Sequence, residues 1–142
     1  MIGCACWLVL LTFLATSSAG IWKTVNRPFY KLTFYNTAYS WSEAKSLCGS
    51  RSSLVQLDVS SVKNDVLNTI SSGSTFYWIG ATDETNEGHW KWMDRSSALI
   101  TCWNSGEPNG RRSENYLVID KNGKCYDHGT NYHTGVICME SQ

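Results

Sequence analysis

The sequence has no excess charge of either sign, no internal repeat and no low-complexity linker. Its 12 Lys and Arg residues balance 12 Asp and Glu residues, and the only adjacent basic pair is Arg111-Arg112. Proteins that bind nucleic acid or anionic membranes usually concentrate basic residues on one surface, so we expect neither partner here. The length of 142 residues indicates one domain.

Long apolar runs are equally scarce. Residues 4–15 form one chargeless, mostly apolar segment, and no later segment is apolar enough to span a bilayer. This run is shorter than the ~20 residues of a membrane-spanning helix, and small residues follow it up to Ala19. The pattern predicts a signal peptide over residues 1–19, although no Lys or Arg precedes the run, and a mature domain over residues 20–142. A membrane anchor is the alternative, but we expect a secreted, extracellular protein.

The cysteines lack the C-x-x-C spacing that is typical of zinc sites. Removal of the signal peptide would leave an even set of four: Cys48, Cys102, Cys125 and Cys138. In a secreted domain such a set predicts two disulfides, and their three possible pairings stay open at this point. A hydrophobic content of 42% with seven Trp residues is sufficient for a packed core.

Local patterns predict two helices and several strands. Ser40 and Glu43 have the spacing of a capping box, which predicts a helix of about three turns that ends at Gly49. Apolar residues at every fourth position predict a second helix over 61–70. Strands are predicted over 29–35, 76–80, 89–93, 116–119 and 135–138. Helices that precede most of the strands indicate an α+β fold with antiparallel sheets.

A long polar stretch without periodicity covers residues 94–113. Loops of this length are usually functional in compact domains. This one contains Glu107-Pro108-Asn109, and Glu114 and Asp127 follow it. Oxygen donors gathered around a loop are the ligands that Ca²⁺ requires. From the residues alone, a solvated surface loop is the favoured reading.

An enzyme is not expected, because no Ser or Cys nucleophile motif accompanies the three histidines. His128 follows Asp127, but neighbours in sequence do not make a catalytic pair. We expect His128 and His133 to be polar residues of exposed loops; a transition-metal site is their alternative. Most Trp residues are expected in the core, and Trp22 is the candidate for an exposed stacking surface.

Taken together, these residues resemble the C-type lectin domain over nearly the whole mature chain. The landmarks that carry the resemblance are Ser40-Trp41-Ser42-Glu43-Ala44, Cys48, Trp78-Ile79-Gly80, Thr82-Asp83-Glu84, Glu87-Gly88, Trp103, Gly106-Glu107-Pro108-Asn109, Glu114 and Val136-Ile137-Cys138. The resemblance implies two helices, a small antiparallel sheet that joins the termini, a second sheet with long loops, and a Cys48–Cys138 disulfide.

The resemblance also implies a calcium-dependent carbohydrate-binding lectin. Its metal and sugar ligands would be Glu107, Asn109, Glu114 and Asp127, with a cis peptide bond before Pro108. The Glu-Pro-Asn triplet resembles the motif associated with mannose, fucose or N-acetylglucosamine. Single sites of this kind bind weakly, so oligomerisation for avidity is possible.

The sequence departs from the family pattern at three places. Tyr126 replaces a ligating Asn, and a neutral phenol is a poor calcium ligand. The usual inner cysteine pair is absent, so we expect a Cys102–Cys125 disulfide instead. The stretch from Asn109 to Glu114 is one residue shorter than in typical members. These departures support an alternative, a protein-binding module that has lost calcium and sugar binding.

An auxiliary calcium site found in some members would map to Asp83 and Glu87. Gly110 stands where that site would want a further carboxylate. The alternative is that Asp83 and Glu87 are ordinary turn residues.

Overall fold

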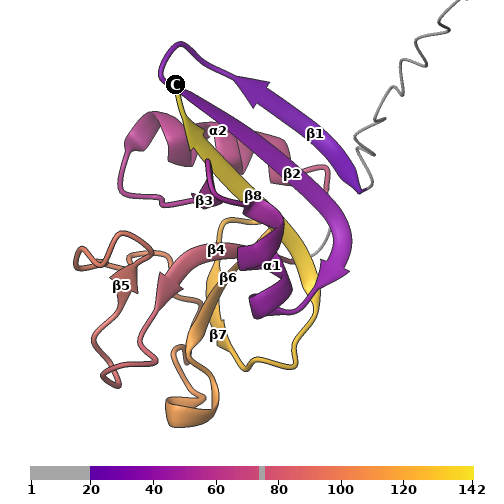
Figure 1. Ribbon diagram of the computed structural model, residues 1–142. Coiled ribbons are helices and arrows are strands. Elements are labelled where there is room, and N and C mark those ends of the chain that lie inside the picture. Colours follow the sequence, from indigo (N-terminus) through magenta and orange to yellow (C-terminus); the bar gives the residue numbers. More distant parts are fainter. Residues whose placement is uncertain (1–19, 74–75) are drawn as a thin grey trace, which may run out of the picture.

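The computed structural model describes residues 20–73 and 76–142, so the predicted signal peptide lies outside the described residues. The elements in chain order are β1 (Ile21–Asn26), β2 (Tyr30–Tyr39), α1 (Trp41–Cys48), β3 (Ser53–Leu54), α2 (Ser60–Ile70), β4 (Phe76–Thr82), β5 (Lys91–Trp92), the 3₁₀ turn η1 (Arg111–Ser113), β6 (Tyr116–Asp120), β7 (Cys125–His128) and β8 (Thr134–Ser141). Figure 1 shows the β1–β2 hairpin and α2 at one end, and β5, η1 and the long loops at the other. The predicted α+β class is confirmed.

The strands form one sheet in the order β1-β2-β8-β4-β6-β7, with β3 paired to β8 and β5 to β4. The pairing of β4 with β8 is parallel, and every other pairing is antiparallel. β2, which lies early in the chain, pairs with β8 at its C-terminal end over most of the length of both strands. Strands from the two ends of the domain therefore pair as expected, but the separate antiparallel sheets implied by the resemblance are one continuous mixed sheet, because β8 also pairs with β4.

Three strands were not predicted from the sequence. β1 is an edge strand in which only Trp22 and Val25 are partly buried, so it lacks a strong apolar pattern. β3 is only two residues long. β7 has the polar sequence Cys125-Tyr126-Asp127-His128, which hides its strand character. The predicted strand at 89–93 is reduced to the two residues of β5.

The helices begin and end as their sequence signals predict. Ser40 caps α1: its hydroxyl accepts from the Glu43 amide at 3.4 Å, and the Glu43 carboxylate accepts from the Ser40 amide at 2.8 Å. Gly49 ends α1 with a φ of 75°, a conformation that suits glycine. With eight residues, α1 is nearer two turns than the predicted three. In α2, Val62, Val66 and Ile70 are buried at the predicted spacing.

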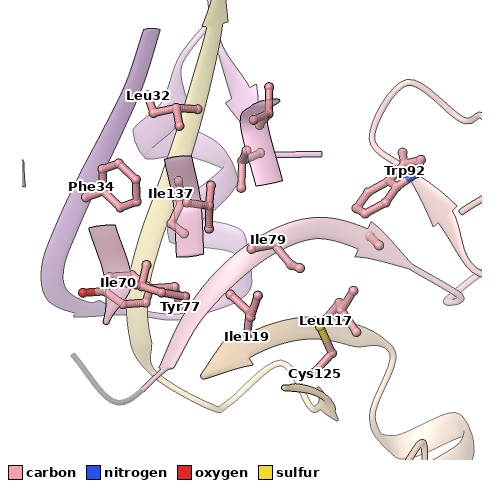
Figure 2. Packing of buried hydrophobic residues seen from close by; sticks show 14 of the residues in the cluster. Leu32, Phe34, Ile70, Tyr77, Ile79, Trp92, Leu117, Ile119, Cys125 and Ile137 are labelled. Atoms are coloured by element: carbon pink, nitrogen blue, oxygen red, sulfur yellow. The ribbon is translucent and has the colours of Figure 1, made fainter. Parts of the chain in front are cut away.

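Two groups of buried side chains lie on opposite faces of the sheet, because neighbouring strand residues point to opposite sides. The larger group, shown in Figure 2, includes Phe34, Tyr77, Ile119 and Ile137 and packs under α2. The smaller group centres on Trp78, which contacts Trp41 of α1 with ring centroids 5.5 Å apart. The two groups connect the helices to the strands that carry the loops.

Trp22 does not supply the exposed stacking surface considered from the sequence. It is partly buried, and its ring lies against Phe34 and Tyr77 at centroid distances of 6.3 and 6.5 Å. These contacts place it at the edge of the larger core.

Both expected disulfides are present. Cys48–Cys138 joins the last residue of α1 to β8 across 90 residues of sequence, and Cys102–Cys125 joins the long loop to the start of β7 across 23. Closing a loop of about 90 residues is worth roughly 4–5 kcal/mol in the chain-entropy model. The first disulfide therefore stabilises the body of the domain, and the second fixes the base of the long loop.

An ion pair ties the β1–β2 turn to α2. Arg27 donates to Asp65 through Nε and Nη2, both at 2.6 Å, and the Tyr30 hydroxyl donates to the same carboxylate at 2.8 Å. The Asp65 side chain is 13% exposed and that of Arg27 is 49% exposed. The Arg27 hydrogen bond lowers the pKa of Asp65 below its usual value.

We expect Asp65→Asn to lower the free energy of unfolding by about 1 kcal/mol at pH 7, a value reduced by the exposure of Arg27. Because the pKa of Asp65 is lower in the folded state, the ion pair contributes above about pH 4 and is lost as the pH falls through that lowered pKa. Urea unfolding of variant and parent from pH 7 to pH 3 should show the difference shrink. The exposed Asp58→Asn is the control, and a gap that stays constant down to pH 3 would contradict the assignment.

Candidate functional site

The predicted ligand residues lie where the long loop meets β7. The Asp127 carboxylate, which is 3% exposed, accepts the backbone amide of Asn109 at 3.0 Å on one oxygen and that of Gly110 at 2.8 Å on the other. The Cys102–Cys125 disulfide lies at the base of the same loop, and the Asn104 amide donates to the Cys125 carbonyl at 2.9 Å. A loop without regular structure is therefore positioned by one carboxylate and one disulfide.

The Glu107–Pro108 peptide bond is cis, as expected. The side chains that flank the proline face each other, because Asn109 Nδ2 donates to Glu107 Oε1 at 2.8 Å. This hydrogen bond leaves the Asn109 amide oxygen available as an acceptor and holds it beside the Glu107 carboxylate. The structure thus brings Glu107, Asn109 and Asp127 together.

Glu107 lies in an unfavourable place for a negative charge. Within the described part of the chain, its Oε2 atom is buried and has no hydrogen-bond partner. Burial, the neighbouring Asp127 carboxylate and, to a smaller extent, Glu114 raise the pKa of Glu107 to about 7. A buried carboxylate beside a second one is stabilised either by a proton or by a cation.

Glu114 follows η1 and approaches the same loop from the other side. A Cβ atom on Gly110 would lie 2.1 Å from Glu114 Oε2, so only glycine leaves room for this approach. From the sequence, Gly110 stood where the auxiliary site would want a carboxylate. In the structure, its missing side chain makes room for Glu114. Glu114 Oε1 also lies 3.9 Å from His128 Nδ1.

The expectation that His128 is an exposed loop residue is wrong. It lies in β7, is partly buried, and stacks on Tyr132 with a centroid distance of 4.0 Å. Burial lowers the pKa of His128 below its usual value. The setting of His128 follows from its position in β7, and the polar sequence of this strand does not indicate a strand. His133 is exposed, as expected.

The Tyr126 side chain is engaged with Phe76 and Asp120. Because β7 is a strand, Tyr126 and Asp127 face opposite sides. The Tyr126 ring packs against Phe76 at a centroid distance of 5.2 Å, and its hydroxyl donates to Asp120 Oδ2 at 3.3 Å. The phenol is therefore engaged in packing, and it supplies no oxygen where the family pattern has a ligating Asn.

The donor set fits a hard cation in part. Glu107 Oε2 is a buried oxygen without a hydrogen-bond partner in the described chain, and Asp127 and Asn109 lie beside it. Among residues 20–73 and 76–142, however, no three His, Cys, Asp or Glu side chains are arranged as a ready metal-binding group. Ca²⁺ prefers six to eight oxygens, so a bound ion would need Glu114 to move closer and water or ligand hydroxyls to complete its shell.

Asp83 and Glu87 line one pocket of about 340 Å³ together with Glu84 and Arg112. Asp83 is 2% exposed; its Oδ2 accepts the Gly88 amide at 2.8 Å, and its Oδ1 is buried and has no partner among the described residues. Burial raises the pKa of Asp83. Asp83 is thus a buried residue whose carboxylate holds the following turn, and the auxiliary calcium site stays a prediction.

Fold, disulfides and loop together define a C-type lectin domain. The family model described as "Lectin C-type domain" matches residues 37–140. The chain belongs to this family.

Curated relatives support the same assignment. The chain is 34% identical to hepatic lectin of Gallus gallus over 103 residues, which cover 70% of this chain and 49% of that protein. It is 32% identical to C-type lectin BML-2 of Bungarus multicinctus over 107 residues, or 68% and 64% of the two chains. The chain therefore spans less than two thirds of the length of these relatives.

Solved structures show the same fold. C-type lectin CEL-I from Cucumaria echinata superimposes with a TM-score of 0.72 at 26% identity, over 82% of this chain and 93% of that one. Herring type II antifreeze protein also superimposes, with a TM-score of 0.73 at 19% identity, over 84% and 96%. The second comparison concerns the fold alone, which does not decide function.

We expect Tyr126→Asn to lower the free energy of unfolding by about 2–3 kcal/mol, because it removes a packed aromatic side chain. Tyr126→Phe keeps the ring and should cost only about 0.5–1 kcal/mol for the lost hydrogen bond. Urea unfolding measures both values. An Asn variant that is as stable as the parent and binds Ca²⁺ more tightly would show that position 126 belongs to the ligand group.

Proposed function

We propose that this chain is a secreted, calcium-dependent carbohydrate-binding lectin. One observation carries the proposal: Glu107, Asn109 and Asp127 lie together. Among the described residues, the buried Glu107 Oε2 atom has no hydrogen-bond partner. Relatives and a structural neighbour named as lectins support the proposal. The two disulfides fit an oxidising extracellular compartment. No helix in the described ranges has the length and apolarity needed to cross a membrane.

The four predicted residues would have different roles in binding. Asp127 positions the loop through two backbone amides, and Glu107 and Asn109 present their side chains on the same side of the proline. Ca²⁺, when bound, would neutralise the carboxylates and attract two neighbouring hydroxyls of a sugar. Carboxylate oxygens of Glu107 and Glu114 would accept from those hydroxyls, and the Asn109 amide would donate to them.

This ligand set points to sugars of the mannose, fucose or N-acetylglucosamine type. Their neighbouring hydroxyls are equatorial or equivalent, as the Glu-Pro-Asn motif requires in the family that the sequence resembles. The proposal contains no bond-breaking step, and we propose no enzymatic activity.

A second candidate is a protein-binding module that works without calcium. Tyr126 favours it, because its side chain is engaged with Phe76 and Asp120 instead of supplying a ligand. Calcium dependence distinguishes the two candidates, since a module of the second kind would bind its partner equally well with chelator.

The effect of calcium on stability tests the ligand set. Ca²⁺ at about ten times its Kd should raise the melting temperature by roughly 3–6 °C, because an ion that binds only the folded state stabilises it. Glu107→Gln should abolish this shift. In chelator the same variant should melt higher than the parent, since it removes a half-buried carboxylate beside the Asp127 carboxylate and keeps the acceptor for Asn109.

Glu140→Gln, a change on β8 outside the loop region, is the matched control and should keep the calcium response. Thermal unfolding with millimolar Ca²⁺ and with chelator separates the cases. If the melting temperature of the parent protein is the same in Ca²⁺ and in chelator, the result would favour the calcium-free module.

A glycan array tests the function directly. We expect mannose-, fucose- or N-acetylglucosamine-terminated glycans to bind in Ca²⁺ and to be released by chelator. Glu107→Gln should lose the same signals. Signals that persist in chelator, or that appear only for glycans without these terminal sugars, would contradict the proposed sugar class.

A further inference from the structure

A tight hairpin turn projects from β5 in the loop half of the molecule (Figure 1). The Arg95 amide donates to the Trp92 carbonyl at 2.8 Å, and the Trp92 amide donates to the Ser96 carbonyl at 3.0 Å. Asp94 Oδ1 accepts the Ser96 amide at 2.8 Å, which closes the turn from outside. This pattern is that of a short hairpin loop whose last turn residue takes a left-handed backbone conformation.

Arg95 occupies that left-handed position, with a φ of 71°. Glycine adopts this conformation without cost, whereas other residues lose about 1–2 kcal/mol there. The turn therefore carries arginine at a position where glycine would be more stable. Residues held in such conformations often serve a binding site, so the contribution of the Arg95 side chain has to be sought outside the turn.

The Arg95 side chain lines a pocket of about 450 Å³. The other lining residues are Thr82, Thr85, Lys91, Trp92 and Met93. The pocket thus combines two cations and two hydroxyls with an apolar side, and none of its lining residues is acidic. Within the described ranges, neither Lys91 nor Arg95 forms an ion pair.

This pocket shares Thr85 with a neighbouring pocket of the loop region. Thr85 also lines the pocket that contains Asp83, Arg112 and Asn115, and the latter two flank Glu114 on the segment that leads into β6. The Lys91–Arg95 pocket and the proposed sugar site therefore both belong to the loop half of the domain (Figure 1).

We propose that the Lys91–Arg95 pocket binds an anionic group on a sugar, a sulfate ester or a carboxylate, and so selects acidic glycans. The guanidinium can pair with two oxygens of such a group, and Thr82 and Thr85 can donate hydrogen bonds to it. Met93, which is partly exposed, offers apolar contact to the sugar ring. The inference rests on the proposed lectin function and names the ligand class more closely.

The experiment compares a mannose-terminated oligosaccharide with its chemically sulfated form, titrated calorimetrically in Ca²⁺. The sulfated form should bind about 3- to 10-fold more tightly, the gain expected for two exposed charge pairs. Lys91→Gln and Arg95→Gly should each reduce this advantage and together remove it, while the affinity for the neutral form stays unchanged. Lys121→Gln and Arg51→Gln, at exposed positions away from the pocket, are the controls for net charge.

The melting temperature of Arg95→Gly is a second measurement, and it distinguishes a binding role of Arg95 from a purely structural one. The substitution should raise the melting temperature, because glycine suits a φ of 71°, and lower the affinity for the sulfated probe at the same time. A lowered melting temperature with unchanged affinity would overturn the proposal. So would an advantage of the sulfated form that survives in the double variant.

Two further arms separate this inference from the proposed function. In chelator, the sulfated oligosaccharide should retain weak binding that depends on Lys91 and Arg95, even if the neutral form no longer binds in any buffer. Inorganic sulfate alone should compete only at much higher concentration. Sulfate that competes as well as the sulfated glycan, or a tyrosine-sulfated peptide that binds more tightly than it, would contradict recognition of an acidic sugar.

Discussion

The packing of β8 between β2 and β4 is the constraint on which the rest of the structure depends. β8 runs antiparallel to β2 and parallel to β4, and Cys138 within it carries the disulfide to α1. A Cβ atom on Gly135 would lie 2.7 Å from the Tyr35 carbonyl and from the Tyr77 ring, so the strands reach this spacing only with glycine there. Through these contacts one strand joins the hairpin half of the domain to the half that carries the loops.

The loop region follows a different principle, because regular secondary structure contributes little to it. Asp127 holds the loop by two backbone amides, and the same carboxylate lies beside Glu107. A single side chain therefore supports the geometry of the loop and contributes to its negative charge. Removing that charge would disturb the loop itself, which is why Glu107 and not Asp127 is the better residue at which to separate binding from folding.

Much of the fold could be predicted from local signals. The capping box at Ser40 and Glu43 and the spacing of Val62, Val66 and Ile70 located both helices, because these patterns report interactions within one segment. β1, β3 and β7 escaped prediction, since an edge strand, a two-residue strand and a polar strand obtain their stability from neighbours far away in sequence.

The site was predictable only in part. Glu107, Asn109 and Asp127 came from resemblance to the family, and the structure brings them together. His128 and Arg95 could not be placed, because their settings depend on a strand pairing and on a backbone angle that single residues do not reveal.

The position of the last residue has a practical consequence. The Gln142 amide donates to the Phe29 carbonyl at 3.0 Å, which places the end of β8 beside the β1–β2 turn. Figure 1 shows this end of the domain opposite η1 and the long loops. A polymer, bead or sensor surface coupled after Gln142 would therefore leave the loop face turned outward. Copies immobilised in this way would present their loops in a common orientation, as a dense array for multivalent capture requires.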